Sequence, residues 1–267
     1  CGSSIFLVET FKRFVKSKII EQKNLNISLQ EMYDVIQNSL FACDLELDAL
    51  RFTSFALLFS VLDFLKDVNL KDFGPFPLLI GKNFVKGDFF DNKIALNKDT
   101  YDVIVGNPPW QSNYGRKAKQ YLEKTEYPVG DKQISQLFLW HATDLIAETG
   151  KICLLMPSKG LLFNFNSKNV EFRELFFNSY TVEKVINLSL FSNLLFENSK
   201  FPASIIVYSK DKTNEATTSV EYITPKPSNR NWEHAILTID SSNIKKLNKK
   251  QILNNQNSGQ PFKDIGL

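Results

Sequence analysis

An apolar run that ends in a rigid turn is the feature that most constrains what this chain can fold into. Residues 101–105 read as a buried strand of a parallel sheet, and Gly106-Asn107-Pro108-Pro109-Trp110 follow directly. The two prolines fix φ and lack N–H groups, so the Asn107 side-chain carbonyl and the Pro108 backbone carbonyl are held outward. Both carbonyls can accept hydrogen bonds from an NH2 group, and the Trp110 indole offers a face to a flat ring. The turn therefore indicates chemistry on an amine attached to such a ring.

The same turn also has an ordinary explanation. Asn-Pro and Pro-Pro pairs are common in loops, and a tryptophan after them can be a rim residue. The position of the turn directly after a strand favours the chemical interpretation.

The order of the remaining elements predicts an α/β fold. Strands alternate with helices, and the last two strands pair as a hairpin, which is typical of a doubly wound, mostly parallel sheet with a C-terminal antiparallel hairpin. Ligands of such sheets bind at the carboxyl ends of the strands. The expected helices cover residues 5–18, 47–65, 133–148, which is expected to be amphipathic, and 172–177. The other expected strands cover 40–43, 78–80 or 84–85, 151–156, 182–188 and 201–209, and 111–130 is expected to be a polar loop.

The composition fits a globular, metal-free protein. The chain has 267 residues, long enough for one large domain with appendages. Three cysteines, Cys1, Cys43 and Cys153, are scattered without metal-ligand spacing, and His141 and His234 do not cluster with them. The scattered cysteines therefore indicate a reduced, cytoplasmic protein. No apolar run is long enough to span a membrane. The net charge of +3 is compatible with a local basic surface but does not by itself indicate nucleic-acid binding.

Three further segments stand where a ligand with an adenosine group would need contacts. Small residues, Cys1-Gly2-Ser3-Ser4, open the chain before an apolar helix; Asp44 follows a strand; and Asp88 with Phe89 follows another. Acids at strand ends bind ribose hydroxyls in dinucleotide folds, and Asp88 can accept from an adenine amine. Each also has an ordinary explanation, as a helix cap, an N-cap or a turn aspartate beside a core ring. Their order along the chain favours the ligand.

In these segments the sequence resembles the N6-adenine DNA methyltransferases of restriction–modification type, and it is nearest to their large type I and type IIG subunits. The resemblance spans residues 1 to about 210. Ser4 stands where the family usually has glycine. Six segments carry the resemblance: Cys1-Gly2-Ser3-Ser4-Ile5-Phe6-Leu7, Asp44 with Leu45, Asp88 with Phe89, Asn107-Pro108-Pro109-Trp110, Gly150-Lys151-Ile152 through Met156-Pro157, and Phe196 six residues before Pro202-Ala203-Ser204-Ile205-Ile206.

The resemblance implies a site. S-adenosylmethionine would be the cofactor, Asn107 with Pro108 and Pro109 would hold the adenine amine, and Trp110 and Phe196 would sandwich the extruded base. Phe196 is alternatively a hydrophobic loop anchor. The residues implied at the cofactor are Cys1, Gly2, Ser3, Asp44, Leu45, Asp88 and Phe89.

The resemblance also implies partners and a domain organisation. Double-stranded DNA would be the substrate, with specificity or restriction subunits as further partners and no membrane. Residues 1–210 would be the catalytic domain, without its first strand because the sequence starts late in the motif, and 211–267 would lead toward a target-recognition domain. Basic residues at 116, 117, 119 and 124, interleaved with Tyr114 and Tyr121, either contact phosphates or form a solvated face; those at 245, 246, 249 and 250 are expected on a helix.

Other functions remain open. Enzymes that methylate an RNA guanine amine or a protein glutamine also use Asn-Pro-Pro-aromatic turns, and a catalytically silent nucleic-acid-binding subunit would keep the fold. A nicotinamide-dependent oxidoreductase fits poorly, because no Gly-x-Gly-x-x-Gly is present.

Overall fold

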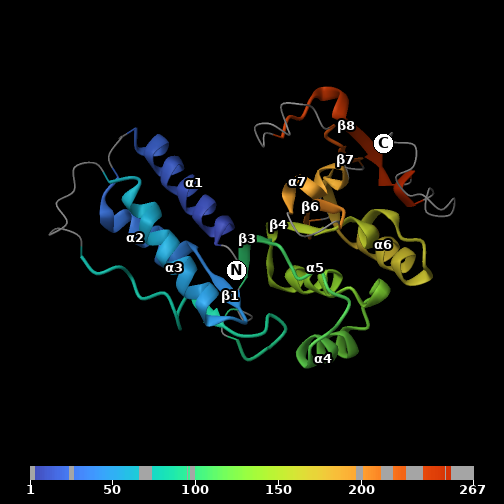
Figure 1. Cartoon of the computed structure of the whole chain (residues 1–267), viewed down its shortest axis with the longest axis horizontal. Helices are drawn as coiled ribbons and strands as arrows, with labels where there is room; N and C mark the ends of the chain where they lie inside the picture. Colours follow the sequence, from blue (N-terminus) through green and yellow to red (C-terminus); the bar gives the residue numbers. More distant parts are fainter. Residues whose placement is uncertain are drawn as a thin grey trace. The chain divides into compact units, whose positions relative to one another are not determined.

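The chain forms two compact units, Cys1–Asp99 and Thr100–Leu267 (Figure 1). The computed structural model describes residues 4–23, 27–65, 74–94, 96, 100–196, 201–211, 219–226, 237–249 and 251–253. Cys1, Gly2 and Ser3, which the sequence places at the cofactor, lie outside the described residues.

The first unit packs helices against a short parallel strand pair. The strands pair in register, so Asp44 lies opposite Lys86. Apolar side chains from the helices and strands, among them Phe11, Met32 and Phe84, form one buried core. The elements are α1 (Ile5–Gln22), α2 (Leu29–Ser39), β1 (Ala42–Asp44), α3 (Leu47–Leu62) and β2 (Phe84–Lys86).

Helix α2 begins at a capping box. The Ser28 hydroxyl accepts from the Glu31 backbone N–H at 3.2 Å, and the Glu31 carboxylate accepts from the Ser28 backbone N–H at 2.8 Å. Two orphan donors at the helix start are thereby satisfied. Hydrogen bonds from Ser28 lower the pKa of the exposed Glu31 carboxyl to about 2.

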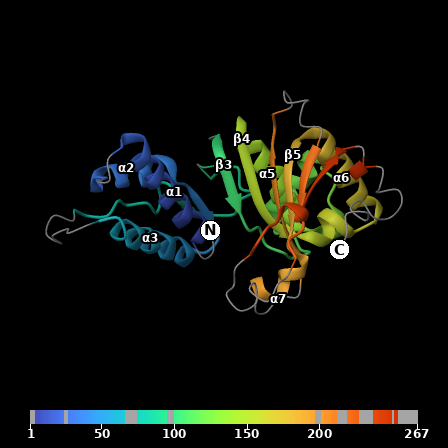
Figure 2. The ribbon, with the colours of Figure 1, turned by 90° about the horizontal axis from the view of Figure 1, so that it is seen from above.

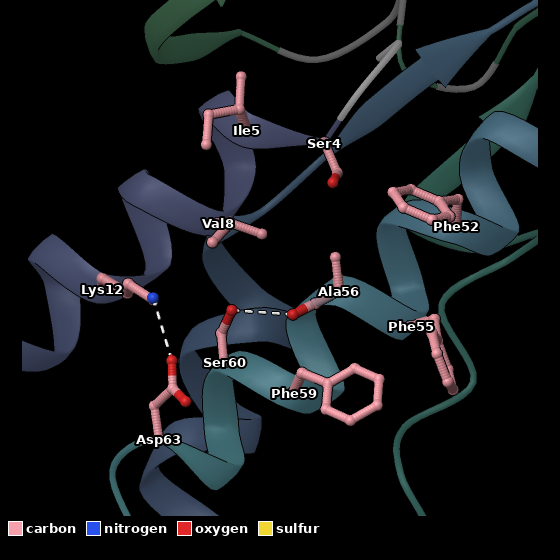
Figure 3. Close-up of a pocket in the computed structure, with 10 residues that line it drawn as sticks. All are labelled: Ser4, Ile5, Val8, Lys12, Phe52, Phe55, Ala56, Phe59, Ser60 and Asp63. Atoms are coloured by element: carbon pink, nitrogen blue, oxygen red, sulfur yellow. Dashed lines mark hydrogen bonds and ion pairs between the residues drawn. The ribbon is translucent and has the colours of Figure 1, made fainter. Parts of the chain in front are cut away.

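Helix α3 carries apolar residues on two sides. Leu50, Leu57 and Val61 are buried in the core, whereas Phe52, Phe55 and Phe59 are 60%, 55% and 53% exposed. The phenylalanines line an open groove of about 460 Å³ between α1 and α3 (Figure 3). Towards the end of α3 the groove is bordered by an ion pair of 3.0 Å between Lys12 and Asp63.

The second unit is built on a six-stranded mixed sheet with strand order β3-β4-β6-β5-β7-β8 (Figure 2). Strands β3 and β4 pair in parallel, as do β5 and β7. Strand β6 runs antiparallel to both β4 and β5, and β8 runs antiparallel to β7. The α/β class and the antiparallel hairpin of β5 and β6 are confirmed. The strands are β3 (Tyr101–Gly106), β4 (Ile146–Pro157), β5 (Thr181–Asn187), β6 (Ala203–Ser209), β7 (Ser219–Ile223) and β8 (Ile244–Asn248).

Aromatic packing holds helices α5 (Ile134–Leu145) and α6 (Ser167–Ser179) against this sheet. The buried Trp140 ring of α5 lies 5.5 Å from Phe176 of α6, and Phe176 lies 4.9 Å from Tyr208 of β6, between ring centroids. The Tyr208 hydroxyl donates to the backbone carbonyl of Leu139 at 2.6 Å. The described part of the unit also contains helices α4 (Arg116–Thr125) and α7 (Ser192–Leu195).

Three local expectations are wrong. The polar segment 111–130 contains helix α4, because Ala118 and Tyr121 form a buried side. Helix α5 ends at Leu145 rather than at 148, because residues from Ile146 onward pair with β3; it is also buried on nearly every side rather than amphipathic. Gly150 is needed for this pairing, since a Cβ there would lie 2.9 Å from the Asp102 carbonyl.

The lysines near 245 and the strand before the turn also differ from expectation. Lys245 and Lys246 lie in strand β8, because they pair with Tyr222 and Glu221 of β7. Lys249 is helical, as expected, and Lys250 lies outside the described residues. Strand β3 is not buried: it is outermost in the sheet, and Val103 and Val105 are 60% and 38% exposed.

The segment after residue 210 contributes β7 and β8 to the same sheet. In its described part the chain therefore continues the sheet rather than leaving it. That residues 211–267 lead toward a target-recognition domain stays a prediction. Among the described residues, each helix is too short or too polar to cross a bilayer.

Candidate functional site

The Asn-Pro-Pro-Trp turn begins where β3 ends, beside the neighbouring strand β4. Gly106, the last residue of β3, pairs with Leu154. Pro108 is buried, whereas Asn107 and Pro109 are exposed. The backbone N–H of Ile134, the first residue of α5, donates to the Gln111 carbonyl at 3.3 Å. The turn is therefore held at both ends, with Asn107 exposed on it.

Asn107 and Trp110 are hydrogen-bonded to each other. The indole Nε1–H of Trp110 donates to Oδ1 of Asn107 at 2.9 Å. An amide oxygen can accept two hydrogen bonds, so this contact orients the amide and leaves capacity for a second donor.

Phe196 lies against the same indole. The ring centroids of Trp110 and Phe196 are 5.0 Å apart, with the rings inclined at 70°. The structure therefore brings together the two aromatic residues that the sequence places around a base, although they are 86 positions apart by number. A base between two faces needs a gap of about 7 Å, two contact distances. In the described arrangement the rings touch edge to face, so a sandwich requires them to separate.

In the first unit, Asp44 and Asp88 follow adjacent parallel strands. Asp44 ends β1 and Asp88 comes two residues after β2, and the Gly87 N–H donates to the Asp44 carbonyl at 2.9 Å. Each carboxylate is fixed by a backbone donor: Oδ1 of Asp44 accepts from Glu46 at 3.0 Å, and Oδ1 of Asp88 accepts from Phe90 at 3.0 Å. Both acids thus stand at the carboxyl edge of one strand pair, where such folds bind ligands.

Apolar residues stand directly beside these acids in the sequence. Leu45 is 62% exposed, and the half-buried Phe89 ring lies 5.7 Å from Phe90, edge to face. Burial raises the pKa of the Cys43 thiol, beside Asp44, to about 11. The thiol donates to the Gly87 carbonyl at 3.3 Å, so it is a structural contact at neutral pH rather than a thiolate.

Ser4 adopts a backbone conformation that is uncommon for residues other than glycine. Its φ is 63°, in the left-handed region that glycine adopts most easily. Ser4 is buried, and its carbonyl accepts from Leu7 and Val8 at 3.0 and 3.1 Å. The first turn of α1 therefore forms with serine in place of glycine.

Helix α4 has one buried face and one exposed, basic face. The Tyr121 hydroxyl donates to Oδ2 of Asp144 at 2.7 Å, which fastens α4 to α5. Arg116, Lys119 and Lys124 are exposed. The helix starts six positions after Trp110, so its basic residues follow the Asn-Pro-Pro-Trp turn closely in sequence.

One polar cluster was missed in the sequence. Ser158, Asn187 and Ser204 are buried and hydrogen-bonded with Ser189 at the ends of β4, β5 and β6. Single serines at strand ends carry no distinctive sequence signal, so only the fold reveals it. No group of three or more histidine, cysteine or acidic residues able to hold a metal occurs among the described residues.

Comparisons with known proteins identify relatives in sequence and in fold. The chain is 25% identical to the type II restriction enzyme and methyltransferase RM.Eco57I of Escherichia coli over 240 residues, which is 74% of this chain and 24% of that protein. The fold is similar to that of the type I restriction enzyme EcoKI M protein, with a TM-score of 0.60, 15% identity and coverage of 85% and 44% of the two chains. It is also similar to the DNA-bound type ISP restriction-modification enzyme LlaBIII, with a TM-score of 0.62, 15% identity and coverage of 84% and 17%.

These solved structures define the class of fold as that of restriction-modification methyltransferase subunits. Residues 38–193, more than half of the chain, match the family model described as Eco57I restriction-modification methylase. The chain belongs to this family. It spans about a quarter of the length of RM.Eco57I and less than half of the EcoKI M protein.

Proposed function

We propose that this chain is the catalytic part of a restriction-modification DNA methyltransferase that transfers a methyl group to the N6 amine of adenine. The observation that carries the proposal is the exposed Asn107 amide on a turn fixed by buried Pro108, with Trp110 and Phe196 beside it. The family match supports the reaction type, and the turn supports an exocyclic amine as acceptor.

The turn acts on the amine by hydrogen bonding. The N6 lone pair of adenine is conjugated into the ring, which makes the nitrogen a poor nucleophile. Oδ1 of Asn107 and the Pro108 carbonyl would accept the two N6–H groups and favour a more tetrahedral nitrogen with an available lone pair. The proton is lost only after the nitrogen gains the methyl group, so no strong base is required. Positioning and preorganised dipoles supply the acceleration.

An adenine inside a duplex cannot reach this turn, so it must be extruded. Trp110 and Phe196 are the rings that would receive it. Because these rings touch in the absence of a base, entry of the base replaces a ring–ring contact by ring–base contacts. Stacking on aromatic side chains contributes about 1–3 kcal/mol per base.

S-adenosylmethionine fits the donor chemistry of the first unit. Its bound sulfonium would supply an electrophilic methyl group. The Asp44 carboxylate is suited to accept from ribose hydroxyls and the Asp88 carboxylate to accept from the adenine amine of the cofactor, with Leu45 and Phe89 packing on its rings. The backbone bonds to Glu46 and Phe90 hold both acids in place before the cofactor arrives.

Helix α4 is proposed to contact the DNA backbone. Arg116, Lys119 and Lys124 are exposed on a helix that starts six positions after Trp110. Basic side chains on phosphates fix the position of a protein on a duplex without reading its sequence. DNA is the substrate that we propose; specificity or restriction subunits are proposed as further partners.

The proposal is tested by supplying the purified protein with radiolabelled S-adenosylmethionine and three acceptors: unmethylated genomic DNA, total RNA and a protein mixture. Label in DNA, recovered as N6-methyladenine after digestion, is expected. Label in RNA or in glutamine would favour the rival amine methyltransferases. Binding of DNA without transfer to any acceptor would favour a silent subunit. Sequencing of the host genome for methylated adenines, with and without the gene, would identify the target site.

A further inference from the structure

A chain of hydroxyl groups joins three strand ends beside the candidate site. Ser158 follows β4, Ser189 follows β5, and Ser204 lies in β6. The Oγ atoms of Ser158 and Ser204 are 2.6 Å apart, and those of Ser158 and Ser189 are 3.3 Å apart. The Ser189 Oγ lies 2.6 Å from Oδ1 of Asn187.

Each serine hydroxyl has one proton to donate, and this fixes which group donates and which accepts along the row of hydroxyls. Oδ1 of Asn187 can only accept, so the Ser189 hydroxyl donates to it. Ser189 then accepts from Ser158, and Ser158 accepts from Ser204. The Asn187 amide nitrogen donates to the Tyr222 hydroxyl at 2.8 Å, which fixes the orientation of the amide. Such a chain is satisfied at every internal position, and its members polarise one another.

Further hydrogen bonds connect Ser189, through Ser192, to Phe196. The Ser189 carbonyl accepts from the Ser192 hydroxyl at 2.9 Å, and the Ser192 carbonyl accepts from the Phe196 N–H at 3.0 Å. The Ser189 N–H donates to Oδ1 of Asn187 at 3.0 Å. The segment that carries Phe196 is thus attached to the buried ends of β4 and β5 by side-chain hydrogen bonds that meet at Ser189.

We propose that Ser189 and Ser158 are positioning residues, which hold the Phe196 segment where its ring meets the Trp110 indole and receives the base. Neither hydroxyl touches the substrate; both act through Phe196. The inference rests on the proposed function, since it assigns these residues a part in the same reaction.

Ser189 is the position to test, because it is only half-buried and its change to alanine leaves the core intact. Ser189→Ala removes the hydroxyl, Ser189→Thr retains it, and Ser167→Ala changes an exposed serine elsewhere as the matched control. Two quantities are measured: hydrogen exchange of the backbone amides of residues 188–196, and kcat with KM for DNA and for S-adenosylmethionine.

In Ser189→Ala, exchange in this segment should rise about fivefold, the factor that one ordinary hydrogen bond represents. A misplaced aromatic ring should lower kcat by about 10- to 100-fold, with the KM for S-adenosylmethionine unchanged. Ser189→Thr should restore both values. Ser158→Ala should also raise hydrogen exchange in residues 188–196. The melting temperature of this variant shows whether the rise is local or comes from global unfolding.

The inference is overturned if Ser189→Ala matches Ser167→Ala in exchange, or if the segment loosens while kcat stays at the wild-type value. Failure of the wild-type protein to methylate DNA would instead reject the proposed function. The exchange measurement distinguishes these cases, because it requires no turnover.

Discussion

The indole N–H of Trp110 is hydrogen-bonded to the side-chain carbonyl of Asn107 at 2.9 Å. The aromatic residue of the turn therefore contributes a polar contact as well as a stacking face. It orients the amide so that its carbonyl points toward the ring side of the turn. The nitrogen of an incoming base would share this carbonyl with the indole or displace it.

Two substitutions distinguish the hydrogen bond of Trp110 from its stacking face. Trp110→Phe keeps an aromatic face but loses the donor, and Trp110→Ala loses both. We expect kcat/KM for DNA methylation to fall by less than about tenfold in the first variant and by about 10- to 100-fold in the second, since stacking contributes about 1–3 kcal/mol. Steady-state methylation assays measure both values. Equal losses in the two variants would show that the hydrogen bond, rather than the ring face, is what matters.

Asn107→Ala should abolish methyl transfer. The variant removes the side-chain acceptor for the amine while leaving Pro108 and the turn in place. The affinity for S-adenosylmethionine, measured by calorimetry, should be unchanged within about twofold, well below the tenfold that 1.4 kcal/mol represents. Asn113→Ala, an exposed asparagine in the following loop, serves as the control. Wild-type turnover in Asn107→Ala would exclude Asn107 from the mechanism.

Asp44 should determine cofactor affinity through its charge. Asp44→Asn retains an Oδ1 for the Glu46 N–H but removes the carboxylate that the ribose hydroxyls would meet. The dissociation constant for S-adenosylmethionine should rise about 10-fold or more, because a hydrogen bond to a charged group contributes about 1.5–3 kcal/mol. The exposed Asp48, paired with Arg51, provides the control Asp48→Asn. Unchanged cofactor binding in Asp44→Asn, with normal folding, would remove Asp44 from the site.

The basic face of α4 should contribute to DNA affinity regardless of sequence. Replacing Arg116 and Lys119 by glutamine removes two positive charges and leaves the buried Tyr121 side of the helix unchanged. The slope of log K against log salt concentration should become shallower by about 2, roughly 0.9 for each lost phosphate contact. Titrations of a labelled duplex at several salt concentrations measure this slope. The same slope as wild type would show that the face is merely solvated.

Trp140 and Trp110 should differ in their effect on stability. Trp140 is fully buried among Tyr127, Phe172 and Phe176, and Trp140→Ala should lower the free energy of unfolding by about 3–5 kcal/mol. Trp110→Ala, on a half-buried ring, should lower it by less than about 1.5 kcal/mol, the upper value for an aromatic pair. Denaturant titrations of both variants test this contrast. A larger loss for Trp110 would indicate a structural role for the turn.

Some parts of this structure could be predicted from the sequence because their signals are local. An apolar run followed by Asn107-Pro108-Pro109-Trp110 specifies a strand and its turn without reference to the rest of the chain. The same is true of the acids after β1 and β2. Whether these acids bind a cofactor depends on how distant parts of the chain come together, so cofactor binding stays a prediction.

Other parts depended on partners distant in sequence. Ile146 joined a strand because β3 offers it backbone hydrogen bonds, which outweighed the helical pattern preceding it. Lys245 and Lys246 lie between Ile244 and Leu247 without a strict apolar–polar alternation, yet they pair with β7. The serine chain from Ser158 to Ser189 needed three strand ends to meet. In each case the deciding contact lies many residues away.

The outermost strands of the larger sheet are protected to different degrees. Strand β8 presents Lys245 and Lys246, and charges on an outer strand discourage pairing with foreign chains. Strand β3 presents Val103 and Val105 instead, and among the described residues it has β4 as its single neighbour. The strand that supports the Asn107 turn thus presents two exposed valines beside one exposed charge, Asp102, and a charged residue at Val103 should reduce precipitation at high protein concentration.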